Sequence, residues 1–177
     1  MLHPELEAFA AMLDSAAQNG IATSQITLQH PLSIDDAYEV QRRLVSKRVE
    51  RTGRICGLKV GFTSKAKMIQ MGVDHVMFGH LPSDRQMQNS GRMSVAHAIH
   101  PRSDPEIAFR LAEDIDYVLS PESALSTVDA IAPAMEIIDS RYKDFQFTLQ
   151  DVIADNSSSS HFVLGDWRPA TIDVSSL

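Results

Sequence analysis

The first fifty residues carry apolar side chains at helical spacing. One apolar stripe runs along residues 2–18 and consists of Leu2, Leu6, Phe9, Leu13 and Ala16. A second stripe runs along residues 34–52, where Ser33 can cap the start of a helix and Gly53 can end it. Both patterns predict amphipathic helices that pack against the rest of the molecule through one face.

The pattern changes after Gly53. Short apolar runs alternate with glycine, proline, asparagine and serine, which is typical of strands joined by turns. The candidate strands are residues 54–62, 106–112, 134–138 and 161–164, with short helices at 64–70 and 148–155 and a polar hairpin loop at 86–91. We expect a single domain over residues 1–177, in which a helical layer (1–53) covers a β-rich core (54–177).

Composition and charge narrow the class of protein. Of the 177 residues, 44% are apolar and 22% are charged, as in ordinary soluble domains. The net charge of -7 argues against a nucleic-acid partner, because phosphate binding needs a basic surface. No apolar run approaches the ~20 residues of a membrane span, and the acidic start lacks the apolar core of a signal peptide. We therefore expect a cytoplasmic protein with no membrane partner.

Two carboxylates stand two residues apart in the run Asp104-Pro105-Glu106. On a strand, that spacing directs both side chains to the same face. Two adjacent anions repel each other and need a cation or solvent. Taken alone, this pair is more often an exposed acidic strand end than a binding site.

A third carboxylate, Glu136, lies inside residues 132–138, the most apolar run of the chain. A buried charge needs a partner, and an ion pair with Arg102 or Arg141 would serve as well as a metal ion. Three carboxylates on two core strands nevertheless suit a hard cation with oxygen ligands, Mg²⁺ or Mn²⁺. Three protein ligands leave room in an octahedron for a small bidentate substrate and one water.

Lys59 is the candidate basic residue. It lies between apolar residues and two glycines, Gly57 and Gly61, and glycines allow backbone or ligand to approach closely. A half-buried lysine near a metal ion could bind a substrate carboxylate or transfer a proton. The alternative is a lysine that extends along a strand edge into solvent, which is common.

Cysteine, histidine and serine offer weaker candidates. Cys56 is alone, so there is no disulfide framework and no thiolate metal cluster, and its apolar neighbours predict a buried structural thiol. His97 and His100 have the spacing of a metal pair but lack further ligands, so we expect a structural or exposed role. His161 could line a site. The serines at 157–160 lack the surroundings of a hydrolase nucleophile and suit a helix end or a substrate carboxylate.

Several runs, taken in order, resemble one known family. They are residues 57–68 (GLKVGFTSKAKM), 70–74 (QMGVD), 78–81 (FGHL), 100–109 (HPRSDPEIAF), 133–141 (PAMEIIDSR) and 152–159 (VIADNSSS). The family is the 2-hydroxypentadienoate hydratase and 4-oxalocrotonate decarboxylase group of the fumarylacetoacetate hydrolase superfamily. The resemblance extends from about residue 33 to the C-terminus.

The resemblance implies a fold, a metal site and a substrate class. The fold would be α+β, a helical N-terminal part on a curved, mainly antiparallel β core like that of fumarylacetoacetate hydrolase. The substrate would be a small 2-oxo acid and the cofactor Mg²⁺ or Mn²⁺. By position, the ligands of the metal match Asp104, Glu106 and Glu136, the active-site lysine matches Lys59, and substrate contacts match Leu81 and Ser158.

The sequence departs from the family at two points. Asp104 stands where the family usually has glutamate, and aspartate reaches one methylene less far. The chain also ends at Leu177, where family members continue with further core strands. We therefore expect the C-terminal part of the core to be missing and strand edges to be left open. The resemblance further implies a homo-oligomer, or a complex between a decarboxylase and a hydratase.

Within the group, Tyr142, Phe145 and the run at 66–73 resemble the decarboxylase branch. The implied reaction is metal-dependent decarboxylation of 4-oxalocrotonate (2-oxohex-3-enedioate) to 2-hydroxypenta-2,4-dienoate in aromatic meta-cleavage catabolism. Phe147 would join Tyr142 and Phe145 in keeping water from the site. The alternative is a 2-hydroxypenta-2,4-dienoate hydratase, and a further alternative is a truncated partner subunit without catalytic activity.

Overall fold

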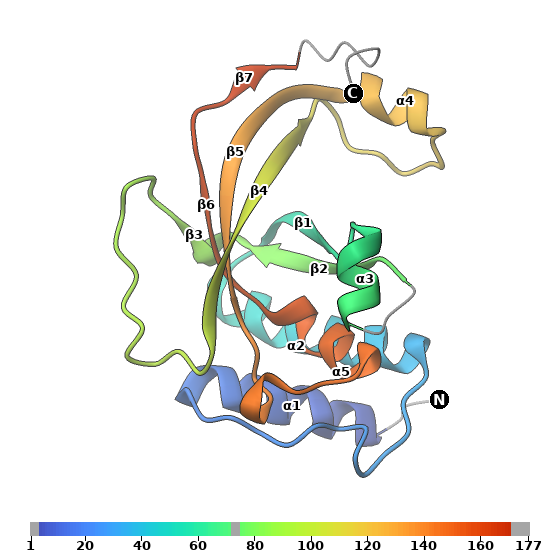
Figure 1. The fold of residues 1–177 in the computed structure, drawn as a ribbon, viewed down its shortest axis with the longest axis vertical. Coiled ribbons are helices and arrows are strands. Elements are labelled where there is room, and N and C mark those ends of the chain that lie inside the picture. The colour runs from blue at the N-terminus through green and yellow to red at the C-terminus, as the bar shows by residue number, and fades with distance from the viewer. Residues whose placement is uncertain (1–3, 72–74, 171–177) are drawn as a thin grey trace.

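The computed structural model describes residues 4–71 and 75–170 (Figure 1). Its α-helices are α1 (Pro4–Asn19), α2 (Ile34–Thr52), α3 (Lys65–Met71), α4 (Pro121–Ser126) and α5 (Leu149–Ala154). Its strands are β1 (Ile55–Gly61), β2 (Met77–Pro82), β3 (Gln86–Met87), β4 (Pro101–Leu111), β5 (Val128–Asp139), β6 (Ser159–Leu164) and β7 (Arg168–Pro169). Short 3-10 turns are η1 (Ser83–Arg85), η2 (Lys143–Phe145) and η3 (Asn156–Ser158).

The two predicted N-terminal helices are present and form one layer with α5 (Figure 1). A capping box starts α2, because the Ser33 side chain accepts from the backbone N–H of Asp36 and the Asp36 carboxylate accepts from that of Ser33. The predicted stripe of α1 is buried at Leu6, Leu13 and Ala16, whereas Leu2 lies outside the described residues. Among the described residues, no helix is both long and apolar enough to cross a membrane.

The buried core lies mainly within this helical layer and the loops that follow β5. It consists of Leu6, Ala10, Leu13, Ile26, Ala37, Val40, Leu44, Met77, Tyr142, Val152, Ile153 and Ala154. Tyr142 is fully buried, and its hydroxyl donates to the backbone carbonyl of Asp151 at 3.1 Å. The core therefore ties the segment after β5 down onto the helices.

Two β-sheets lie on one side of the helical layer. The smaller pairs β1 with β2, and the larger has the order β3-β6-β5-β4, with β7 also paired to β5. Its longest element is the antiparallel β4–β5 hairpin, which rises away from the helices (Figure 1). The described part of the fold is thus α+β, as expected.

Four predictions for the β-rich part need correction. The strands predicted at 106–112 and 134–138 begin earlier, at 101 and 128, because strand pairing continues through the prolines at 105 and 133. The expected hairpin loop at 86–91 is instead a short strand, β3, parallel to β6, followed by a turn. Cys56 is exposed rather than buried, because alternate residues of β1 face outward.

Candidate metal and substrate site

The register of β4 and β5 places the three predicted carboxylates on one face of the hairpin. Asp104 lies directly opposite Glu136, and Glu106 lies opposite Ala134, two residues further along β4. Directly opposed residues of an antiparallel pair have their Cβ atoms about 5 Å apart. The face predicted from the two-residue spacing is therefore present, and β5 adds the third carboxylate to it.

The three carboxylates differ in burial. Glu136 is only 6% exposed, Asp104 is half-buried, and Glu106 is exposed. Glu136 Oε2 accepts a hydrogen bond from Lys59 Nζ at 2.7 Å, so its cationic partner is a lysine rather than the arginine considered above. Its other oxygen, Oε1, is buried and has no hydrogen-bond partner among the described residues. An unpaired oxygen of this kind costs ~1–3 kcal/mol or more.

Electrostatics at Glu136 favour an additional cation. Burial raises the pKa of Glu136; Lys59 opposes the rise, while Glu106 and Asp104 add to it. The three acids therefore lie close enough to repel one another. The unpaired Oε1 and the all-oxygen donor set fit a hard ion such as Mg²⁺.

The three carboxylates are not arranged around a single point. Within residues 4–71 and 75–170, no three Asp, Glu, His or Cys side chains lie close enough together to hold a metal ion as they stand. Convergence of Asp104, Glu106 and Glu136 on one ion would require the two β4 side chains to turn toward Glu136. It therefore stays a prediction.

Lys59 reaches Glu136 from the smaller sheet. On β1 it shares the inward face with Gly57 and Gly61, and it pairs in register with Gly79 of β2. Its side chain is 11% exposed, so it does not extend into solvent. Besides Glu136, its ammonium donates to the backbone carbonyl of Ser157 at 3.0 Å.

Leu81 and Ser158 lie on the elements that surround Lys59. Leu81 is half-buried and faces Gly57 across the β1–β2 pair, on the same side as Lys59. Ser158 belongs to η3, where the residues 156, 157 and 158 all have left-handed φ angles of 50°, 53° and 56°. Its hydroxyl is buried without a hydrogen-bond partner in the described part of the chain, so it is available to a substrate oxygen.

A buried ion pair, which sequence reasoning did not find, supports this turn. The Arg141 guanidinium contacts the Asp155 carboxylate and also donates to the carbonyls of Asp139 at 2.7 Å and Ser159 at 3.0 Å. Burial raises the pKa of Asp155 to about 6, although Arg141 opposes the rise. Arg141 thereby joins the end of β5 to the segment that carries Ser158.

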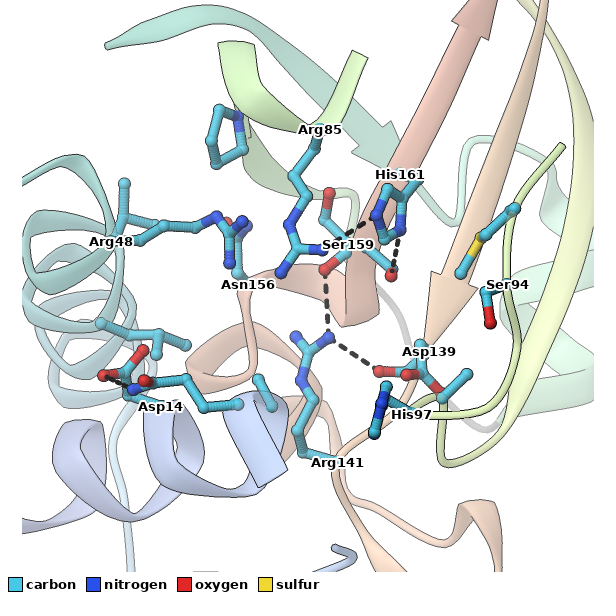
Figure 2. A pocket seen from close by; sticks show the side chains of 18 residues that line it. Asp14, Arg48, Arg85, Ser94, His97, Asp139, Arg141, Asn156, Ser159 and His161 are labelled. Atoms are coloured by element: carbon cyan, nitrogen blue, oxygen red, sulfur yellow. Dashed lines mark hydrogen bonds between the residues drawn. The ribbon is translucent and has the colours of Figure 1, made fainter. Parts of the chain in front are cut away.

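A cavity of about 360 Å³ lies beside the same segment (Figure 2). Its lining includes Arg48, Arg85, Arg141 and His161, but not the six residues predicted for the site. Arg85 Nη1 lies 2.9 Å from His161 Nε2. Burial, together with Arg85 and Arg48, lowers the pKa of His161 to about 4, so this ring is neutral at pH 7 and accepts from Arg85. His161 thus lines a cavity, but Asp104, Glu106 and Glu136 do not line it.

His97 and His100 lie in different surroundings. His97 lines the cavity in Figure 2. His100 packs edge-on against Phe145, with ring centroids 6.2 Å apart. His97 is exposed and His100 packs against a ring, so both fit the structural or exposed role expected for them.

The comparisons with known proteins agree with the fold. No protein-family model matches the chain. A 4-oxalocrotonate decarboxylase from Pseudomonas sp. is 49% identical over 173 residues, which are 98% of this chain and 68% of that protein. A 2-hydroxypent-2,4-dienoate hydratase from Pseudomonas putida is 37% identical over 148 residues, 81% of this chain and 66% of that protein.

One similar solved structure is that of 4-oxalocrotonate decarboxylase from Pseudomonas putida G7, complexed with magnesium and adipate. The similarity covers 100% of this chain and 67% of that chain, with 31% sequence identity and a TM-score of 0.86. The fold and these similarities thus define a relative of carbon–carbon and carbon–oxygen lyases. The chain belongs to the 4-oxalocrotonate decarboxylase and 2-hydroxypentadienoate hydratase family. It spans about two thirds of the length of these relatives.

Proposed function

We propose that this chain carries the metal and substrate site of a 4-oxalocrotonate decarboxylase. The observation that carries the proposal is the buried Lys59–Glu136 pair with its unpaired carboxylate oxygen, facing Asp104 and Glu106. The 49% identity to a protein of that name favours the decarboxylase over the hydratase. The similar decarboxylase structure is complexed with magnesium and with adipate, a six-carbon dicarboxylate, which supports the cofactor and the substrate class.

In this reaction the bond between C5 and C6 of 2-oxohex-3-enedioate breaks and C6 leaves as CO₂. The electron pair moves through the C3–C4 double bond to the 2-oxo oxygen and gives the dienolate of the product. Asp104, Glu106 and Glu136 would hold Mg²⁺ or Mn²⁺, which would supply Lewis-acid stabilisation of that oxygen. The reaction needs no oxidant or reductant.

The side chains around the metal would divide the remaining work. The Lys59 ammonium has three N–H donors, of which two are directed to Glu136 and Ser157. The third can donate to a substrate carboxylate or transfer a proton. The free hydroxyl of Ser158 can donate to a substrate oxygen, and Leu81 would provide an apolar wall that keeps water from the dienolate.

The aromatic argument for a decarboxylase needs correction. Tyr142 is fully buried in the helical core and cannot shield the site from water. Phe147 packs against the same core. Phe145 instead packs against the Arg102 guanidinium, whose central carbon lies 3.6 Å from the centroid of the ring. Arg102 precedes Asp104 by two residues on β4. The choice between the two reactions therefore rests on sequence similarity and not on these aromatic residues.

The deciding experiment offers 2-oxohex-3-enedioate and 2-hydroxypenta-2,4-dienoate separately, each with Mg²⁺. We expect CO₂ release from the first and little hydration of the second. Rapid hydration without CO₂ release would favour the hydratase, which the 37% identical relative represents. Inertness toward both, with no Mg²⁺ or Mn²⁺ bound, would favour a non-catalytic partner subunit.

The outer face of β4 is the basis for the proposed assembly. Ile107, Phe109 and Leu111 are 65%, 56% and 50% exposed, and β4 has an unpaired edge among the described strands. Apolar side chains at a sheet edge favour contact with another chain. We propose a homo-oligomer, which light scattering at several concentrations would test; a strictly monomeric protein would contradict it.

A further inference from the structure

We propose that Asn156, packed against Gly79, is the positioning residue for the Lys59 ammonium. The proposal rests on the proposed function, in which Lys59 acts on the substrate. It assigns a role to two residues that touch neither the carboxylates nor a substrate in the scheme above.

The Asn156 side-chain amide forms two hydrogen bonds with the backbone of β2, as the backbone of a neighbouring strand would. Its Oδ1 accepts from the backbone N–H of His80 at 2.7 Å, and its Nδ2 donates to the carbonyl of the same residue at 2.9 Å. The residue is only 6% exposed, so water competes little for these two bonds. This side chain ties η3 to β2 together with the Ser157 hydroxyl, which donates to the Phe78 carbonyl at 3.0 Å.

The backbone of Asn156 has to adopt an unusual conformation for this contact. Its φ angle is 50°, in the left-handed region that asparagine tolerates better than most residues. The two serines that follow it in η3 are left-handed as well, at 53° and 56°. Such a turn persists because side chains around it hold it in place. The Asn156 bonds to His80 share this work with the Ser157 hydroxyl and with Arg141, which donates to the Ser159 carbonyl at 3.0 Å.

Gly79 lets this turn approach the lysine. A Cβ atom on Gly79 would lie 2.7 Å from the carbonyl oxygen of Asn156 and 3.2 Å from Lys59 Cγ. The first distance is shorter than such contacts allow, and the clashing atom is backbone. Gly79 also pairs in register with Lys59. The turn and the aliphatic part of the lysine side chain therefore both pack where Gly79 lacks a side chain.

The Lys59 ammonium is therefore held by two acceptors that come from different elements. The turn presents the Ser157 carbonyl to Lys59 Nζ at 3.0 Å, while β5 presents Glu136 at 2.7 Å. Two fixed acceptors from different elements orient the third N–H of the ammonium. If the turn shifts, the Ser157 carbonyl moves and this orientation is lost, although Glu136 and the other carboxylates stay in place.

The test replaces Asn156 by glycine, which keeps the left-handed φ and removes both bonds to His80. We expect kcat for decarboxylation to fall about tenfold or more, since small misplacements cost that much, while KM and the Mg²⁺ dissociation constant stay nearly unchanged. Gly79→Ala should produce the same split by displacing the turn. Asn89→Gly, the same change in an exposed loop, is the matched control and should leave both constants unchanged.

A second measurement does not depend on turnover. The rate of Lys59 acylation by an amine-selective reagent, measured by peptide mass spectrometry against the exposed Lys143, should rise several-fold in Asn156→Gly and not in Asn89→Gly. If Asn156→Gly does not fold, Asn156→Asp, which keeps the acceptor and loses the donor, takes its place in both measurements.

The outcomes separate this proposal from the proposed function. If the wild-type protein releases no CO₂, the proposed function fails, and the acylation rates still decide whether Asn156 positions Lys59. A folded Asn156 variant with wild-type kcat and wild-type acylation of Lys59 would overturn the positioning role. So would a parallel loss of kcat and Mg²⁺ affinity with unchanged acylation, because that pattern indicates general damage.

Discussion

The helical layer buries its apolar side chains, whereas strand β4 of the β4–β5 hairpin leaves several of its own exposed. In the layer, α1, α2 and α5 enclose Leu13, Val40 and Ile153 almost completely. On β4, by contrast, Phe109 is 56% and Ile107 is 65% exposed. The layer can therefore supply stability from its own contacts, whereas the hairpin carries the proposed metal site and leaves large apolar side chains exposed.

The polar groups follow the same division. The Arg141–Asp155 pair beside the layer has side-chain exposures of 6% and 0%, whereas the Arg110–Asp129 pair on the hairpin has 51% and 42%. Buried charges without a partner are costly, while exposed pairs contribute little. The comparison implies that mutations near the layer affect folding and that mutations on the inner face of the hairpin affect catalysis.

The largest expected effect comes from breaking the buried pair. Arg141→Met leaves the Asp155 carboxylate buried without its cation and should lower the free energy of unfolding by about 3–5 kcal/mol. Arg110→Met, the same change in the exposed pair, should cost less than about 1 kcal/mol. Urea denaturation of both variants measures the difference, and equal losses would contradict the division between the two regions.

The second effect concerns activity. Glu136→Gln removes the charge that faces Lys59 and the predicted metal ion, and should reduce kcat by about 100-fold or more. The free energy of unfolding should fall by less than in Arg141→Met, because burial already disfavours the Glu136 charge and the Lys59 ammonium keeps the Ser157 carbonyl as an acceptor. Steady-state kinetics and urea denaturation together check this. A large loss of stability with normal turnover would place Glu136 among the structural residues.

The third effect tests the corrected position of Tyr142. Tyr142→Phe removes the hydrogen bond to the Asp151 carbonyl and should lower the free energy of unfolding by about 1 kcal/mol. The ratio of decarboxylation to hydration should not change, because the ring lies in the helical core. A shift of that ratio toward hydration would restore Tyr142 to the site.

Local signals allowed much of the fold to be predicted. Ser33, the predicted helix cap, caps α2 through side-chain bonds to the first turn of that helix. Likewise, the two-residue spacing of Asp104 and Glu106 is enough to place them on one face of a strand. Helix and face predictions succeed here because their causes lie within a few residues.

The remaining features depend on contacts that are distant in sequence. The partner of Glu136 is Lys59, from a separate sheet, and no local pattern distinguishes it from Arg102 or Arg141. Strand β3 has only two residues and exists because β6 pairs with it. The role of Asn156 depends in the same way on His80, which lies on another strand.

The smallest effect is a pH dependence near the cavity. The folded pKa of His161 is about 4, below its ordinary value of 6.5, through burial and the nearby Arg85 and Arg48, with Asp84 and Asp139 opposing. Between these two pH values the unfolded chain binds more protons than the folded one at this site, so this contribution to stability rises with pH. It is fully present above pH 6.5 and is lost as the pH falls through about 4.

The measurement is urea denaturation at pH 7 and pH 5 for the wild type and for His161→Gln, which cannot gain that proton. We expect the variant to lose less stability than the wild type between these two pH values. An equal loss in both proteins would show that His161 is already screened by solvent in the cavity.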